Sequence, residues 1–152
     1  MSDIKMKPSR AIFSTVIILV GLWVVYLVIS SLLSNNIRLI APAGFITAEV
    51  ADTDESRTKG LSGHDQLTES EGMLFVFEQA SLENCFWMKD MTFAIDMVWL
   101  DDEKHVVTVE PNVTPETYPN KFCPDMPAKY GLELASGRAS TLGIVPDSKL
   151  RW

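Results

Sequence analysis

The longest apolar run in the hydrophobic pattern lies near the start of the chain. Residues 11–33 include no charged side chain. A helix of this length, rising about 1.5 Å per residue, spans a hydrocarbon layer roughly 30 Å thick. Because the run has no polar face, it does not fit a helix of a soluble domain. The pattern therefore predicts one transmembrane helix over residues 11–33.

The charges that flank this run predict its orientation. Lys5, Lys7 and Arg10 precede it, against one acidic residue, Asp3. Positively charged flanks stay in the cytoplasm. We therefore expect residues 1–10 to lie inside and the rest of the chain to lie outside the cytoplasm, as in a single-pass protein of the cell membrane.

A cleaved signal peptide is the alternative to this membrane anchor. Residues 41–43 read Ala-Pro-Ala, which resembles the small-x-small pattern of a cleavage site. The apolar run is, however, longer than the roughly 7–15 apolar residues of a signal peptide. We therefore expect an uncleaved anchor, followed by a tether over residues 34–43.

After the tether, the periodicity becomes that of short strands. Residues 46–50 alternate between apolar and polar side chains, and several later runs are apolar over strand length. Short helices are predicted after Thr53 or Asp54, ending near Gly60, and after Ser136, ending near Gly143. Strands are predicted at residues 46–50, 72–77, 85–89, 95–101, 105–109, 130–135 and 150–152.

These elements predict the fold class of residues 44–152, which would form the extracytoplasmic domain. The count is seven or eight short strands and two short helices, with no long helix between successive strands. A parallel sheet with crossover helices is therefore disfavoured. We predict a β-rich α+β domain, compact and barrel- or sandwich-like. Five prolines within residues 110–128 predict a pinned surface loop or a functional lid.

The charge of this part of the chain limits its partners. From residue 37 onward, 10 Lys and Arg stand against 19 Asp and Glu, a net charge of −9. Such an acidic surface disfavours nucleic acid and anionic lipid headgroups as partners. The membrane partner is then the apolar helix alone, and the acidity otherwise indicates a solvated surface.

The chain has two cysteines, Cys85 and Cys123. Outside the cytoplasm their oxidation is allowed. A disulfide between them would pin the proline-rich segment to the strand that contains Trp87, and we predict this bond. Two free, buried cysteines are the alternative.

Five residues are candidates for ligand binding. Trp87 and Lys89 lie in one apolar run, Asp96 and Trp99 in the next, and Arg57 on the first short helix. A charge in an apolar run is costly unless it is paired, so Lys89 and Asp96 could hold a ligand between the tryptophans. The structural alternatives are an ion pair of Lys89 with Asp96, or a lysine that reaches solvent. The tryptophans could simply be part of the hydrophobic core. Arg57 could bind an anion or be an exposed charge on the helix.

The sequence contains no recognisable catalytic constellation. Asp96 and Glu133 could form a glycosidase-like carboxylate pair, although the apolar neighbours of Glu133 indicate that it points to the opposite, wetter face. The two histidines are far apart and there is no Cys-x-x-Cys pattern, so we predict neither a metal nor a cofactor.

In their order, the motifs of the chain resemble the domain of unknown function 192 family of small, often exported prokaryotic domains. The resemblance covers about residues 45–150. It implies a compact β-rich fold and gives no catalytic residues. After Lys89 the family pattern has Asn-Thr, where this chain has Asp90-Met91. The matching segments are residues 50–53, Arg57 with 60–63, 72–77, 86–89, 95–101, 130–137 and Gly143.

From these observations we expect a membrane-anchored, extracytoplasmic binding or interaction module. Its partner would be a small molecule or a component of the cell envelope. The alternatives are an extracytoplasmic hydrolase that uses carboxylates and a structural envelope protein.

Overall fold

The chain divides into two compact units, with the boundary between Ser34 and Asn35. The computed structural model describes residues 10–32 and 35–152, and side chains of the first segment only over residues 15–26. The first unit contains one helix, α1 (Arg10–Leu32). Within the described residues, no helix is both long enough and apolar enough to cross a membrane. Residues 1–9 of the predicted cytoplasmic segment lie outside the described residues.

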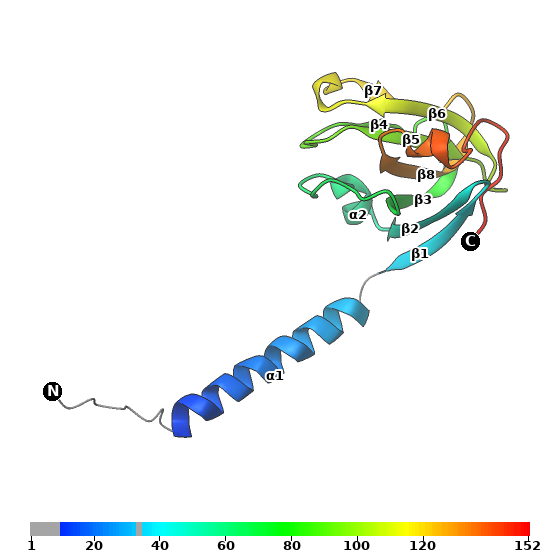
Figure 1. Cartoon of the computed structure of the whole chain (residues 1–152). Helices are drawn as coiled ribbons and strands as arrows, with labels where there is room; N and C mark the ends of the chain where they lie inside the picture. The colour runs from blue at the N-terminus through cyan, green and yellow to red at the C-terminus, as the bar shows by residue number, and fades with distance from the viewer. Residues whose placement is uncertain (1–9, 33–34) are drawn as a thin grey trace. The chain divides into compact units, whose positions relative to one another are not determined.

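Residues 35–152 form a β-rich α+β domain with eight strands (Figure 1). The number of strands agrees with the sequence prediction. Its short helices are α2 (Asp54–Lys59) and α3 (Arg138–Thr141), with a 3-10 turn, η1 (Pro115–Thr117). The strands are β1 (Asn36–Ala41), β2 (Gly44–Ala51), β3 (Glu71–Ser81), β4 (Phe86–Trp87), β5 (Ile95–Leu100), β6 (Val106–Val113), β7 (Lys121–Phe122) and β8 (Ala128–Ala135).

Six of the strands form one sheet in the order β1-β2-β3-β8-β5-β6. The sheet is open, with β1 and β6 at its edges, so the predicted barrel or sandwich is corrected to an open sheet. Strands β2 and β3 are parallel, and the other pairs within this sheet are antiparallel. The parallel pair also departs from the sequence prediction, because the short helix α2 and its following loop suffice as the crossover.

Both faces of the sheet are covered by apolar side chains, which explains why β5 is buried at every position. One face, here the α3 face, carries Leu74, Val98 and Leu132 beneath residues of α3 and of the C-terminal segment. The other, here the α2 face, carries Phe75 and Trp99 in a cluster that includes β4. A strand between two covered faces has no solvated side.

Much of the segment predicted as a tether over residues 34–43 belongs to the sheet, while residue 34 lies outside the described residues. Residues 36–41 form β1, where Leu39 is fully buried. The C-terminal segment then reaches both edges of the sheet, since Arg151 bridges to Ile40 of β1 and Lys149 bridges to His105, next to β6. The predicted last strand is therefore a pair of isolated bridges.

The proline-rich segment is more ordered than a loop. β6 continues to Val113, η1 follows, and β7 pairs with β4 in a two-stranded ribbon. The Tyr118–Pro119 peptide bond is cis. This ribbon carries Phe86 and Trp87 to the α2 face of the sheet, where the candidate site lies.

Candidate functional site

Side chains alternate between the two faces of the sheet along β8, and this places the carboxyl group of Glu133 on the apolar α2 face. Leu132 and Leu134 belong to the cluster on the α3 face, so Glu133 points to the opposite side, as expected. That side is not wetter, however. Met73 of β3 and Met97 of β5 are the register partners of Glu133, and both are buried. Only 5% of Glu133 is exposed.

Glu133 has an unsatisfied oxygen in this apolar surrounding. Its Oε2 atom is buried and has no hydrogen-bond partner. Burial raises the pKa of Glu133 from 4.5 to about 8, because loss of hydration disfavours the charged form. The carboxyl group therefore keeps its proton at neutral pH. Buried polar groups are nearly always hydrogen-bonded in native proteins, so this one requires an explanation.

Glu133 lines a cavity of about 310 Å³, here the α2 cavity. The cavity is bounded by α2 and the turn that follows it, by β3 and by β4. Its other lining residues are Asp54, Arg57, Thr58, Lys59, Gly60, Leu61, Ser62, Phe75, Phe77, Cys85, Phe86, Trp87 and Met91. The volume lies at the lower end of the range for small-molecule sites.

Phe86 forms the centre of the aromatic lining. Its ring centroid lies 4.7 Å from that of Phe75 and 6.1 Å from that of Phe77. A Cβ atom at Gly131 would lie only 2.3 Å from the ring of Phe86. The glycine therefore allows Phe86 to pack directly on β8, two residues before Glu133.

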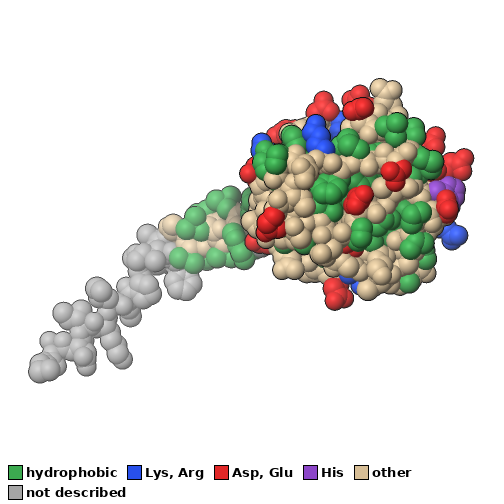
Figure 2. Space-filling view, turned by 90° about the horizontal axis from the view of Figure 1, so that it is seen from above, with side chains coloured by type: hydrophobic (Ala, Val, Ile, Leu, Met, Phe, Trp, Pro, Cys, Tyr) green, Lys and Arg blue, Asp and Glu red, His purple; other side chains and the backbone are tan. Residues whose placement is uncertain are grey.

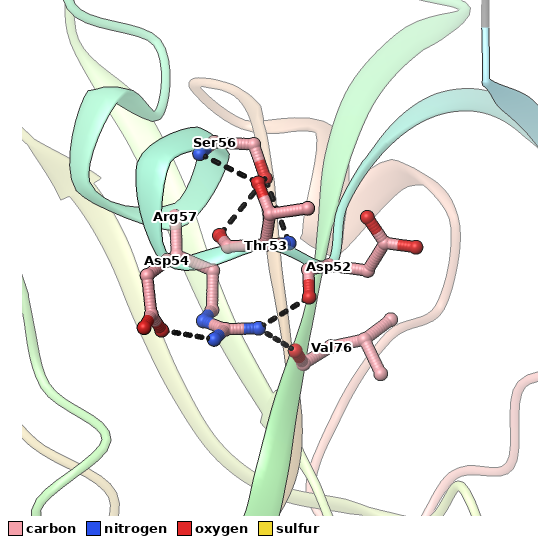
Figure 3. Close-up of polar contacts among 6 residues, drawn as sticks. All are labelled: Asp52, Thr53, Asp54, Ser56, Arg57 and Val76. Carbon is pink, nitrogen blue, oxygen red and sulfur yellow. Dashed lines mark hydrogen bonds and ion pairs between the residues drawn. The ribbon is translucent and has the colours of Figure 1, made fainter.

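Arg57 is held by the protein itself (Figure 3). Its Nη1 atom donates to the carbonyl oxygens of Asp52, at 2.7 Å, and Val76, at 2.8 Å, and its Nη2 atom pairs with Asp54. The helix start is fixed nearby, where Thr53 and Ser56 form a capping box, as the sequence predicted for Thr53. Arg57 thus ties α2 to β3, and these contacts already occupy much of the fork that an anion would need.

The disulfide between Cys85 and Cys123 is present, as predicted. It joins the start of β4 to the segment that follows β7, so it fixes the ribbon beside the α2 cavity. Trp87 is 44% exposed at the edge of this cavity. Its ring meets Tyr118 edge to face, with centroids 6.4 Å apart, and lies 5.5 Å from the Nζ atom of Lys121.

The remaining candidates do not assemble with Arg57 and Trp87. Lys89 is exposed, and its carbonyl oxygen accepts a hydrogen bond from Ser62. Trp99 is fully buried, and its indole N–H donates to the carbonyl oxygen of Asn84 at 2.7 Å. Trp99 is therefore core, which was the structural alternative.

Asp96 is a fully buried structural carboxylate. Its Oδ1 atom accepts hydrogen bonds from the amides of Asn112 and Gly137, and its Oδ2 atom accepts one from Ala139. Of the two structural alternatives, the ion pair with Lys89 does not occur among the described residues, because three backbone amides satisfy Asp96 and Lys89 is exposed instead. These amides join β5 to β6, to the turn before α3 and to α3 itself.

The sequence did not single out Glu133 as a binding residue. A glutamate between two leucines has the alternation of a half-solvated strand, and only the cover provided by β4 and the α2 turn makes its side apolar. The one available signal was Gly131, since a glycine inside a strand indicates a close approach of another group.

Comparison with family models identifies the domain. Residues 39–152 match the model of DUF192, described as "Uncharacterized ACR". The chain belongs to the DUF192 family. The resemblance drawn from the sequence is thereby confirmed for this DUF192 domain, and the family description assigns it no activity.

Two solved structures are similar to this DUF192 chain. One is "a putative transcription regulator" from Sinorhizobium meliloti 1021, with 28% identity, a TM-score of 0.68, and coverage of 76% of this chain and 91% of that one. The other is a protein of unknown function from Novosphingobium aromaticivorans DSM 12444, with 25% identity, a TM-score of 0.65, and coverage of 77% and 84%. No curated protein sequence matches the chain significantly.

Among the described residues, no group of three His, Cys, Asp or Glu side chains could hold a metal ion. The DUF192 domain offers instead a small cavity with an aromatic lining and one protonated carboxyl group.

Proposed function

We propose that this DUF192 domain is a ligand-binding module whose site is the α2 cavity. The observation that carries the proposal is Glu133, a buried carboxyl group with an unpartnered oxygen in the wall of a cavity. Leaving a buried acceptor unsatisfied costs about 1–3 kcal/mol. A bound molecule with a hydrogen-bond donor would remove this cost, which favours occupancy of the cavity.

The walls of the cavity are suited to a fixed site. Arg57 secures α2 to the sheet through two carbonyl oxygens, and the disulfide secures β4 to the segment after β7. A site that is already formed loses little conformational entropy on binding. Of the sequence candidates, Arg57 and Trp87 belong to this site, whereas Lys89, Asp96 and Trp99 do not line it.

A screen of small fragments by NMR tests the binding function. We expect binding to shift the amide resonances of cavity residues, above all those of α2 and β4. Thr58→Trp should block the opening and abolish these shifts, because Thr58 lines the cavity. Glu55→Trp, on the same helix but outside the lining, is the matched control and should leave binding intact. Shifts that map elsewhere, or survive Thr58→Trp, would contradict the proposal.

The proposal includes an uncleaved membrane anchor over residues 11–33, with the domain outside the cytoplasm. Three observations support it: the run has no charges, Lys5, Lys7 and Arg10 precede it, and the disulfide fits an oxidising compartment. Protease added to spheroplasts should digest residues 35–152 without lysis. Protection of the domain until the cells are lysed would contradict this location.

The charge of the domain disfavours nucleic acid as the ligand. Acidic side chains are spread over the face of the domain seen in Figure 2, in keeping with the excess of 19 acidic over 10 basic residues from residue 37 onward. A binding site for a phosphate backbone needs clustered Lys and Arg. The α2 cavity has two basic residues in its lining, Arg57 and Lys59.

A further inference from the structure

The chemistry of the α2 cavity indicates which ligand it would take. Glu133 lacks a hydrogen-bond donor at Oε2, and burial, with no charged partner, accounts for its raised pKa. The two basic side chains of the lining do not supply the missing partner. Arg57 is engaged by Asp52, Val76 and Asp54, and Lys59 is exposed on α2.

The rest of the lining is suited to a positive charge. Phe75, Phe77, Phe86 and Trp87 all contribute to the cavity. The face of an aromatic ring attracts a cation, and this attraction grows when the cation is desolvated. A carboxyl group among these aromatic side chains therefore offers an ammonium group both a counter-charge and an aromatic lining, of which the Trp87 ring already has Lys121 Nζ at 5.5 Å.

We propose that the α2 cavity binds a small organic amine in its protonated, primary or secondary form, with an N–H group that donates to Oε2 of Glu133. This inference rests on the proposed binding function. A quaternary ammonium ion has no N–H group and would leave the acceptor unsatisfied. An anion would face the carboxylate of Asp54, while Arg57 is already occupied.

Binding of such a cation displaces the proton of Glu133 to solvent, so that an ion pair forms in the cavity. The other charged groups that face the cavity are Asp54, Arg57 and Lys59, all from α2 or its C-terminal end. Because the free carboxyl group holds its proton up to about pH 8, affinity should rise with pH toward that value, by at most tenfold per pH unit.

Three molecules of nearly the same shape and different charge test this inference: benzylammonium, benzyl alcohol and benzoate. Their binding to the full chain in a neutral detergent can be measured by calorimetry at pH 7. We expect benzylammonium to bind at least about tenfold more tightly than benzyl alcohol, since charge-assisted hydrogen bonds are the stronger ones, and benzoate to bind least. Glu133→Gln should remove the preference for the cation, because the amide cannot ionise and offers no counter-charge.

The control variant is Glu78→Gln, which removes a glutamate of β3 that is exposed and outside the cavity lining. It should change none of the three affinities. Equal binding of benzylammonium and benzyl alcohol, both shifting cavity resonances, would overturn the amine inference and leave the binding function intact. Absence of benzylammonium binding up to 10 mM, about the weakest affinity measurable in this way, would also overturn it. Failure of the whole fragment screen would overturn the binding function itself.

Discussion

Asp96 and Glu133 lie on opposite faces of one sheet. Met97 is the register partner of Glu133, whereas Asp96 lies opposite Leu134. Directly opposed residues of antiparallel strands share a face, so the two carboxyl groups cannot meet across a substrate. This excludes the glycosidase-like pair considered from the sequence. It also separates their roles, because Asp96 is saturated with backbone donors and Glu133 has an oxygen without one.

The raised pKa of Glu133 predicts that the domain loses stability as the pH rises. Between pH 4.5 and about 8, the unfolded chain releases this proton while the folded chain retains it. Unfolding is therefore increasingly favoured across this window, and the loss is complete above pH 8. For a pKa shift of this size, the free energy of unfolding falls by at most roughly 5 kcal/mol.

Urea unfolding of the full chain in detergent at pH 5 and pH 8 measures this loss. The isosteric variant Glu133→Gln cannot ionise, so its stability relative to the wild type should improve from pH 5 to pH 8. An identical pH dependence of the two proteins would show that Glu133 is hydrated in the folded state.

Replacing Asp96 should destabilise the domain without any ligand present. Asp96→Ala leaves three backbone amides without their acceptor, at a cost of about 3–5 kcal/mol in the free energy of unfolding. Asp102→Ala removes an exposed carboxylate from the turn after β5 and should change stability by less than about 0.5 kcal/mol. Similar unfolding midpoints for the two variants would refute the structural role of Asp96.

Arg57→Lys should loosen α2. A lysine cannot form the forked contact to two carbonyl oxygens and Asp54, so we expect a loss of about 1–3 kcal/mol in stability. Relative to the wild type, the variant should show a larger increase in hydrogen exchange at the amides of α2 than at those of β8. Lys59→Ala, at the end of the same helix, serves as the control. If exchange in α2 does not change with Arg57→Lys, the guanidinium does not hold the helix.

The disulfide should contribute measurably to stability. It closes a loop of 38 residues, and in the chain-entropy model its loss costs about 3–4 kcal/mol. The double variant Cys85→Ala, Cys123→Ala should show this loss in urea unfolding. Met126→Ala, an exposed position in the same region, should not. A loss below about 1 kcal/mol would mean that the ribbon of β4 and β7 is held by its packing alone.

Much of the fold could be predicted from local patterns. The strand at residues 46–50, the helix capped by Thr53 and ended by Gly60, and the pairing of the two cysteines depend on neighbouring residues or on composition. The parallel pairing of β2 with β3 could not be predicted in this way. It depends on a crossover over residues 52–70 whose helix, α2, has only six residues.

Less of the candidate site could be predicted from the sequence. Asp96 stood out because it interrupts an apolar run, yet its partners are backbone amides from residues 112, 137 and 139, which have no sequence signature. Glu133 entered only as a partner for Asp96 and not as a binding residue, because its alternation is that of an ordinary strand. Its isolation arises only when β4 and the α2 turn cover the sheet, which is a property of the assembled fold.

The most direct test of the account is the pKa of Glu133 itself. A pH titration of its side-chain carboxyl carbon by NMR, with Glu133→Gln to assign the signal, measures this value in the folded chain. We predict a midpoint near 8, falling when benzylammonium is added. A midpoint near 4.5 would show that the carboxyl group is hydrated or already paired, and would contradict the proposed site.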